Sequence, residues 1–410
     1  MKSAKSTCST EAWGGLGLRK KIRSFLALKG NIPALALAQL ISSTNWNMFE
    51  VIWQPYALSL GASVVVLGAL GSIQTGIGSG LQFITGRISD SLGRKPVQVV
   101  AYLCSIAALL ISTLSNTWYP LVLSAFLFAL GGSLWDPANT SMIAESVERW
   151  ERGTAYSVIS LSWFIPGFFA PTIAGYLALL YGLRQVLLVC MTLEFISLLT
   201  FVLLIKETLI VEQKIELHDP LRSVKRVFGS KLGLSKFYIA VIGDAFAWRM
   251  TSAILFGILT KTYRFTPMQL GSLLTAFCVV SALSQIPVGR AVDKYGRKKL
   301  LITSEAVGLA VLAGYVISQE FSEFLIWYGL FGIVASTWFP AYQAYIANAV
   351  SDEARARAVG DLNALRGLIS LPAPLIGGIL FDLYGFDAPI LTSLILLVVV
   401  LLILTTIEER

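Results

Sequence analysis

Long apolar runs, separated by short polar connections, recur along the whole chain of 410 residues. Each run has about 20 residues, the length of an α-helix that crosses a hydrocarbon core of about 30 Å. At mid-bilayer the backbone has no water to bond with, so each run must satisfy its own hydrogen bonds, as a helix does. Only 14% of the residues are charged, against about 25% in soluble domains. The sequence therefore predicts an all-α integral membrane protein.

Twelve such runs are present, and we expect one transmembrane helix in each. Their approximate ranges are 34–58, 65–85, 97–115, 119–142, 154–180, 186–205, 237–260, 268–288, 300–318, 323–347, 358–383 and 388–407. The predicted organisation is a cytoplasmic tail (1–30), a six-helix bundle (31–205), a cytoplasmic central loop (206–236), a second six-helix bundle (237–407) and a cytoplasmic C-terminus (408–410).

Lys and Arg are distributed unevenly between the two sides of this topology. An even number of helices puts both termini on one side, and 27 of the 32 basic residues lie in the termini and loops of that side. The opposite loops contain only Arg184, Lys261 and Arg264. Because positive loops remain cytoplasmic, we expect both termini in the cytoplasm of a cell whose membrane the chain crosses many times. The net charge of +8 follows from this topology, so nucleic-acid binding is not needed to explain it.

A charged ten-residue loop occurs twice, 203 residues apart. The copies run from Gly86 to Lys95 and from Gly289 to Lys298, and other residue pairs keep the same offset from Leu67 to Gly182. Such a constant register predicts two copies of one unit. Glycines permit a tight turn, and the Asp and Arg of each loop can lock neighbouring helix ends. The residues concerned are Gly86, Arg87, Asp90, Gly93 and Arg94 in the first copy, and Gly289, Arg290, Asp293, Gly296 and Arg297 in the second.

Twelve helices, a six-plus-six duplication and the loop pattern G-x-x-x-D-x-x-G-R-K together resemble the major facilitator superfamily of secondary transporters. The resemblance implies two pseudo-symmetric six-helix bundles that rock about a central site. In that family the loop is thought to stabilise the outward-facing state, so the resemblance implies a gating role for both copies, without contact to substrate. Residues 170–175 match the family's antiporter pattern G-P-x-x-G-G only in part, because alanine replaces two of its glycines.

Proline and glycine interrupt helices at matching places in the two halves. Proline removes a backbone hydrogen bond and bends a helix, and broken helices of transporters bend or border the cavity. The candidates are Pro137, Pro171 and Gly175 in the first half, and Pro340, Pro374 and Gly378 in the second. The alternative is that membrane helices simply tolerate these residues.

Charged side chains inside the predicted helices are few, and each costs about 3 kcal/mol on insertion scales. Glu50 lies on a helix surface beside Trp46 and Trp53, and it is our first candidate for a proton-binding site; a structural hydrogen-bonding role is the alternative. Asp136 and Asp244 are further candidates for proton coupling. Asp244 and Arg249 are about 140° apart around one helix, so they require partners on other helices. Glu50, Asp136 or Asp361 could serve Arg249.

An aromatic set accompanies these charges and could form the wall of a pocket for an amphipathic or cationic organic molecule. Aromatic packing between helices is the alternative. The predicted substrate-binding residues are Trp46, Glu50, Trp53, Trp248, Arg249, Trp338 and Tyr342.

The leading functional hypothesis is a monomeric, proton-coupled carrier that exports small amphipathic compounds by alternating access. Uptake of a sugar, organic acid or similar nutrient is the alternative, with Arg249 binding an anionic group. A non-transporting membrane receptor on the same fold is a third. We expect no enzyme, because the sequence has no nucleophile and base constellation and no phosphate-binding loop. The four cysteines and the single histidine lack metal-ligand spacing, so neither a metal nor a cofactor is expected.

Overall fold

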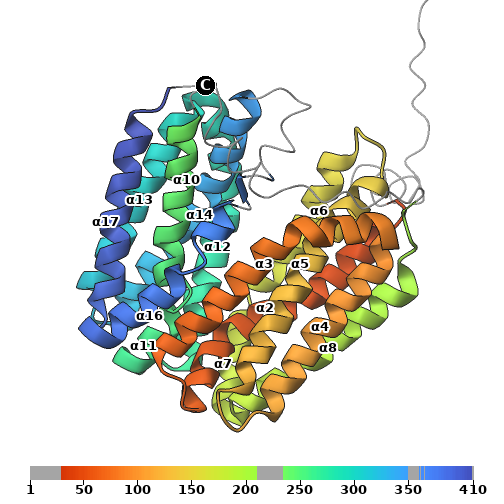
Figure 1. Cartoon of the computed structure of the whole chain (residues 1–410), viewed down its shortest axis with the longest axis horizontal. Coiled ribbons are helices and arrows are strands. Elements are labelled where there is room, and N and C mark those ends of the chain that lie inside the picture. Colours follow the sequence, from red (N-terminus) through yellow and green to blue (C-terminus); the bar gives the residue numbers. More distant parts are fainter. Residues whose placement is uncertain (1–28, 210–233, 350–359, 361, 364, 409–410) are drawn as a thin grey trace, which may run out of the picture.

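Two helical bundles lie side by side and diverge towards the end at which the C-terminus lies (Figure 1). This computed structural model describes residues 29–209, 234–349, 360, 362–363 and 365–408. The tail before Lys29 and most of the central loop therefore lie outside the described residues, as do Asp361 and the side chain of Asp293. All regular elements of the described residues are helices, which confirms the predicted fold class.

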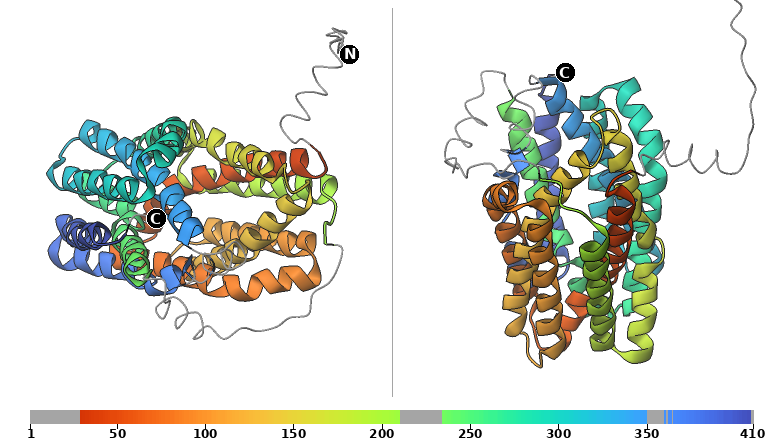
Figure 2. Two further views of the ribbon diagram at one scale, coloured as in Figure 1. Left: turned by 90° about the horizontal axis from the view of Figure 1, so that it is seen from above. Right: turned by 90° about the vertical axis from the view of Figure 1, so that its right-hand side faces the viewer.

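The first bundle contains seven helical segments. They are α2 (Ile32–Ser59), α3 (Val64–Leu92), α4 (Arg94–Leu114), α5 (Pro120–Glu145), α6 (Arg152–Gly167), α7 (Ala170–Tyr181) and α8 (Leu183–Leu204). α6 and α7 form one crossing that is interrupted at Phe168 and Phe169. The bundle therefore has six crossings, and Figure 2 shows them grouped on one side of the molecule.

The second bundle repeats this arrangement. Its segments are α10 (Ser235–Ser252), α11 (Leu255–Tyr263), α12 (Pro267–Tyr295), α13 (Arg297–Ile317), α14 (Phe321–Ala349), α16 (Ala373–Tyr384) and α17 (Asp387–Thr405). Residues 365–384 form one crossing that is interrupted before α16, at the position equivalent to the break between α6 and α7. The crossing made by α10 and α11 is also interrupted, at Ala253 and Ile254. That break contains no proline, and it was not predicted from the sequence.

Eleven crossings of the described chain are long and apolar enough to span a membrane. The twelfth, α2, has 28 residues but contains Asn45, Asn47, Glu50 and Gln54, which lower its hydropathy. Of these four side chains, Asn45, Asn47 and Gln54 are buried. A transmembrane helix with this much polarity must face protein or a cavity, because lipid offers its polar groups no partner.

Glycine and proline have different roles at the predicted bending points. Pro171 and Pro374 lie in the first turn of α7 and α16, where a missing N–H costs nothing. Pro137 and Pro340 lie inside α5 and α14, which continue beyond them. Gly93 and Gly296 make the turns into α4 and α13 with φ of +101° and +90°, a region that favours glycine.

The two bundles share one apolar core at the end of the molecule opposite the C-terminus, which we call the closed end. This core contains residues of both halves, such as Leu67, Ala174, Leu270 and Phe381. Towards the other end the cores are separate, one built only from the second bundle and two only from the first. The halves are therefore packed together at the end that contains α7, α11 and α16, and are independent at the end that contains the C-terminus.

Four glycines allow the halves to approach closely at the closed end. A Cβ on Gly68 would lie 2.3 Å from the carbonyl oxygen of Pro374, and one on Gly271 would lie 2.2 Å from that of Pro171. These two contacts are related by the offset of 203 residues. Gly175 and Gly378 make a second related pair, at 2.3 Å from the Pro267 oxygen and 2.6 Å from the Val64 oxygen. The sequence predicted bending at Gly175 and Gly378, and the structure gives both a close helix contact.

Hydrogen bonds across the closed end follow the same symmetry. The Gly257 N–H donates to Gln54 Oε1 at 2.6 Å, and these residues are themselves 203 apart. Ser72 Oγ accepts from the Leu375 N–H at 3.2 Å. At the equivalent positions, the side-chain hydroxyls of Thr275 and Thr172 are 2.9 Å apart. Closure of this end is therefore built from two copies of one small-residue contact.

We predict that Gly68→Ala or Gly271→Ala opens the closed end, because each added methyl overlaps a backbone oxygen that cannot move independently. The measurement is labelling of a cysteine at Thr172 by a membrane-impermeant maleimide, in a background without native cysteines. Labelling should rise several-fold, on the order of the effect of 1 kcal/mol. Gly80→Ala on the same helix meets nothing within 4 Å and is the matched control. Equal labelling of all three variants would contradict the prediction.

Candidate functional site

The first charged loop holds together the ends of three helices of one bundle. Arg94, at the start of α4, is buried and pairs with Asp90 at the end of α3. Its Nη2 also lies 3.1 Å from Glu145 Oε1 at the end of α5. Glu207 accepts from the backbone N–H groups of Arg94 and Lys95 at 3.1 and 2.8 Å. Burial acts to raise the pKa of Glu207, but these and two further backbone N–H groups hold it below the usual value.

Two contacts of the second loop can be compared with those of the first among the described residues. The amide oxygen of Asn348, which occupies the position equivalent to Glu145, accepts from Arg297 Nη1 at 2.9 Å in the orientation that satisfies both groups. Lys298 Nζ donates to the Thr405 carbonyl at 2.8 Å, as Lys95 Nζ does to that of Val202 at 2.8 Å. Both loops therefore fasten helix ends within their own bundle.

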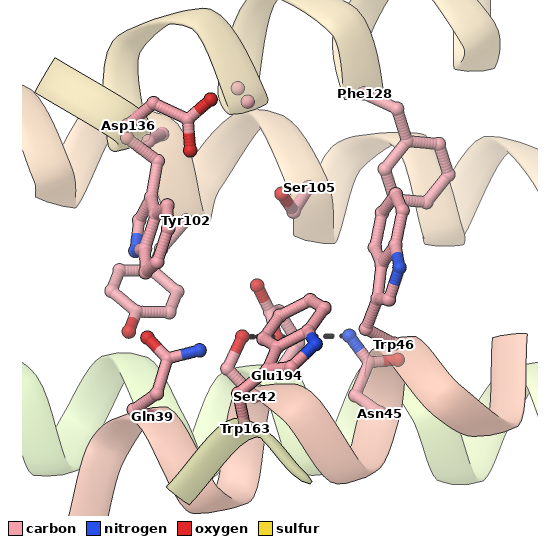
Figure 3. A pocket seen from close by; sticks show the side chains of 14 residues that line it. Gln39, Ser42, Asn45, Trp46, Tyr102, Ser105, Phe128, Asp136, Trp163 and Glu194 are labelled. Atoms are coloured by element: carbon pink, nitrogen blue, oxygen red, sulfur yellow. Dashed lines mark hydrogen bonds between the residues drawn. The ribbon is translucent and has the colours of Figure 1, made fainter. Parts of the chain in front are cut away.

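A cavity of about 260 Å³ lies inside the first bundle, between α2, α4, α5, α6 and α8. Figure 3 shows the side chains that surround it. Five of its fourteen lining residues are aromatic, namely Trp46, Tyr102, Phe128, Trp135 and Trp163. Two carboxyl groups, Asp136 and Glu194, also line it, and none of the described lining residues is Lys or Arg. We call this space the aromatic cavity.

Glu194 is the most buried acid of the aromatic cavity, with 4% of its surface exposed. Ser42 Oγ and Asn45 Nδ2 donate to its Oε2 at 3.0 and 2.9 Å, both from α2 (Figure 3). Among the described residues, no donor reaches its other oxygen, Oε1. Asp136 lies on another wall of the cavity and accepts from Gln82 Nε2 at 3.0 Å. Each carboxyl therefore keeps an oxygen or an open side for a ligand.

A second cavity of about 300 Å³ adjoins the first and reaches the other bundle. Trp46, Phe128, Gly132 and Asp136 line both spaces. Arg249 of α10 lines only the second. The structure thus brings three sequence-predicted residues, Trp46, Asp136 and Arg249, to one continuous space between the two bundles. Of the carboxylates proposed for Arg249, neither Glu50 nor Asp136 forms an ion pair with it in the described structure; its Nη1 donates to Ser370 Oγ at 2.6 Å.

The remaining predicted residues lie elsewhere. Glu50 adjoins Trp53 on its own helix and Tyr328 of α14, at the junction of the bundles. Trp53 lines a small separate pocket of the first bundle. Trp248 packs on Phe331, with ring centroids 4.5 Å apart. None of the three lines the aromatic or the adjoining cavity.

Asp244, Trp338 and Tyr342 are buried together inside the second bundle. Asp244 pairs with Arg366, whose Nη2 lies 3.8 Å from Asp244 Oδ2, and the Arg366 guanidinium lies 5.6 Å from the centre of the Tyr342 ring. The partner that the sequence required for Asp244 on another helix is therefore Arg366.

Sequence reasoning missed Tyr102, Trp135, Trp163 and Glu194 as site residues. None of these four residues is among the candidates named from the sequence. The available signal for Glu194 was the charge itself, since an acid inside a membrane helix requires a partner. Only the packing of α8 against α2 shows which way that acid points.

Comparison with known proteins agrees with this architecture. The family model of the Major Facilitator Superfamily matches residues 35–242 and 237–410. An uncharacterized MFS-type transporter, MJ1317, of Methanocaldococcus jannaschii is 24% identical over 393 residues, which cover 93% of this chain and 97% of that protein. The multidrug resistance protein MdtG of Proteus mirabilis is 26% identical over 311 residues, which cover 74% of this chain and 76% of its own.

Solved transporters share the fold. The nucleoside transporter NupG superposes with a TM-score of 0.74 at 14% identity, covering 91% of this chain and 98% of its own. A bacterial homologue of the lysosomal transporter Spinster, in an inward-facing and unoccupied conformation, gives 0.70 at 14% identity, covering 94% and 96%. The duplicated loops, the twelve crossings and the match of the family model over both bundles together establish that this chain belongs to the Major Facilitator Superfamily of transporters.

Proposed function

We propose that this transporter exports amphipathic organic cations in exchange for protons. The observation that carries the proposal is the aromatic cavity, in which two carboxyl groups lie among five aromatic side chains and no described lining residue is Lys or Arg. Multidrug resistance proteins among the relatives support export as the direction.

The chemistry of the aromatic cavity favours a cationic ligand. Indole and phenol faces attract cations by about 0.5 to 2 kcal/mol each when water is excluded. A buried carboxylate without a basic partner adds a stronger, charge-assisted contact. The apolar ring surfaces bind the body of the same molecule. A neutral sugar would not neutralise the negative charge of either carboxyl group, and this disfavours a sugar as the ligand.

Alternating access explains how a ligand would cross. With the termini in the cytoplasm, as the basic residues predict, the described state is closed towards the outside and open inwards. A ligand would enter between the bundles from the cytoplasm. Rocking of the bundles about the cavity would then close the cytoplasmic end and open the outer end. Asp136 lines both cavities and is the proposed site at which a proton competes with the cation. Glu50, at the junction of the bundles, is a second proposed proton site. The paired loops are proposed to stabilise the closed cytoplasmic side.

Uptake of an organic anion is a second candidate, because Arg249 lines the adjoining cavity. Its guanidinium is held by Ser370 rather than by a carboxylate among the described residues. An anionic ligand could therefore take the free side of this group.

The charge on Glu194 provides the first test. We expect Glu194→Gln to weaken the binding of a cationic dye such as ethidium by about tenfold or more, since loss of a charged hydrogen-bond partner costs about 1.5 to 3 kcal/mol. Binding of an uncharged dye of similar size should change little. Dye fluorescence with protein in nanodiscs measures both. Glu320→Gln, at an exposed position before α14, is the matched control. Equal effects on both dyes would argue against a cation site.

Transport direction provides the second test. In inside-out proteoliposomes with an acidic interior, wild-type protein should accumulate the cationic dye, and dissipation of the pH gradient should abolish accumulation. Asp136→Asn should reduce this accumulation, because it removes a cavity carboxyl. Gradient-driven entry of an organic anion into right-side-out liposomes, lost in Arg249→Gln, would instead support uptake.

Gating by the first loop provides the third test. Asp90→Asn removes the ion pair with Arg94, so we expect transport to fall by about tenfold while dye affinity changes little, because Asp90 lines neither cavity. Glu148→Gln, in the loop between α5 and α6 on the same side, is the control. A comparable loss of dye affinity in Asp90→Asn would refute the gating role.

A further inference from the structure

The aromatic cavity has a charged counterpart in the second bundle. Adding 203 to the positions of its lining residues converts Trp46 to Arg249, Tyr102 to Glu305 and Trp163 to Arg366, whereas Trp135 becomes Trp338. Three aromatic positions of one half are thus ionisable positions of the other. Both bundles therefore contain the equivalent region, but its side chains are aromatic in the first bundle and ionisable in the second.

The counterpart is a compact buried cluster on α10, α13, α14 and residues 365–370. Asp244 and Glu305 are 2% and 0% exposed, and their carboxyl groups adjoin one another. Arg366 Nη2 lies 3.8 Å from Asp244. The Trp338 indole also faces Asp244. Neither oxygen of Glu305 reaches a hydrogen-bond donor among the described residues.

Asp244 has basic side chains near it, whereas Glu305 has none among the described residues. Arg366 is the basic side chain that pairs with Asp244, and Arg249 lies near enough to influence Asp244 but bonds Ser370. From α14, Trp338 and Tyr342 face the cluster. α17 packs on α10 and α13 through Ser393, Leu397 and Val400, none of which is charged. No described basic group contacts Glu305. Two adjoining carboxylates in a low-dielectric interior cannot both remain ionised, because repulsion and desolvation act together.

We propose that Asp244 and Glu305 form a proton-binding site of this transporter, separate from the aromatic cavity and controlled by Arg366. The pair holds one proton while Arg366 neutralises the remaining negative charge. Arg366 is the most exposed of the three, at 24% of its side chain, so water reaches the pair past its guanidinium. A proton passes from water to a carboxyl oxygen and later returns to water on the other side. This inference rests on the proposed proton-coupled transport, and it adds to the proton sites proposed in the first half one in the second half, away from the organic ligand.

The first experiment needs no substrate, so it remains informative if the organic ligand has been misidentified. Infrared difference spectroscopy of the unliganded protein at neutral pH should show a protonated carboxyl band that is lost in Glu305→Gln. The band should also disappear in Asp244→Asn, because Glu305 then loses its negative neighbour and gains Arg366 as its ion partner. An isolated buried Glu305 would keep the band in Asp244→Asn. That result, or an unchanged spectrum in Glu305→Gln, would overturn the proposal.

The second experiment separates coupling from transport. Glu305→Gln should retain counterflow exchange of the dye but reduce its pH-driven accumulation by about tenfold or more, the size of a typical coupling free energy. Glu305→Asp should recover part of the accumulation, and Glu320→Gln, at an exposed position before α14, should behave as wild type. Normal accumulation in Glu305→Gln would overturn the proposal, as would loss of exchange without recovery in Glu305→Asp. Failure of wild-type exchange would instead count against the proposed function.

Discussion

The close approach of two glycines to proline carbonyl oxygens at the closed end is the interaction on which the arrangement of this protein depends. Gly68 against Pro374 and Gly271 against Pro171 leave no room for a side chain, so the helices approach to backbone distance. Interfaces in lipid lack a hydrophobic driving force and rely on such packing. Because the contact occurs twice across the pseudo-symmetry, it joins the bundles at one end and leaves their cores separate at the other.

The two bundles retain nearly the same backbone contacts but have diverged inside. Lys95 and Lys298 bond equivalent carbonyls, and both loops fasten equivalent helix ends. The interior positions differ, because the first bundle encloses an aromatic space and the second fills the equivalent region with ion partners. An open space can accept a ligand, whereas a filled ionic cluster can only gain or lose a small ion. The equivalent region thus contains the proposed ligand site in the first bundle and the proposed Asp244–Glu305 proton site in the second.

Much of the fold could be predicted because the information for it is local. The length of an apolar run predicts a crossing, and the fixed offset predicts the duplication and both charged loops. Site residues were harder to predict. Trp46, Asp136 and Arg249 share a space as the sequence suggested, whereas Glu50, Trp53 and Trp248 lie outside it. Those three have the same residue types as true cavity residues, so composition could not separate them.

The sequence by itself determined twelve apolar segments, their orientation preference, the repeat and the positions of every intramembrane charge. Only the tertiary structure decided which charges meet. Glu194 and Glu305 lie on α8 and α13, helices at the outside of their bundles. Each side chain nevertheless points inwards, and the two reach different environments. A helix presents its side chains in all directions around its axis, and the rotation of each helix is set by packing against neighbours far away in sequence. The partners of Asp244 and Arg249 could therefore be seen only after the helices were packed.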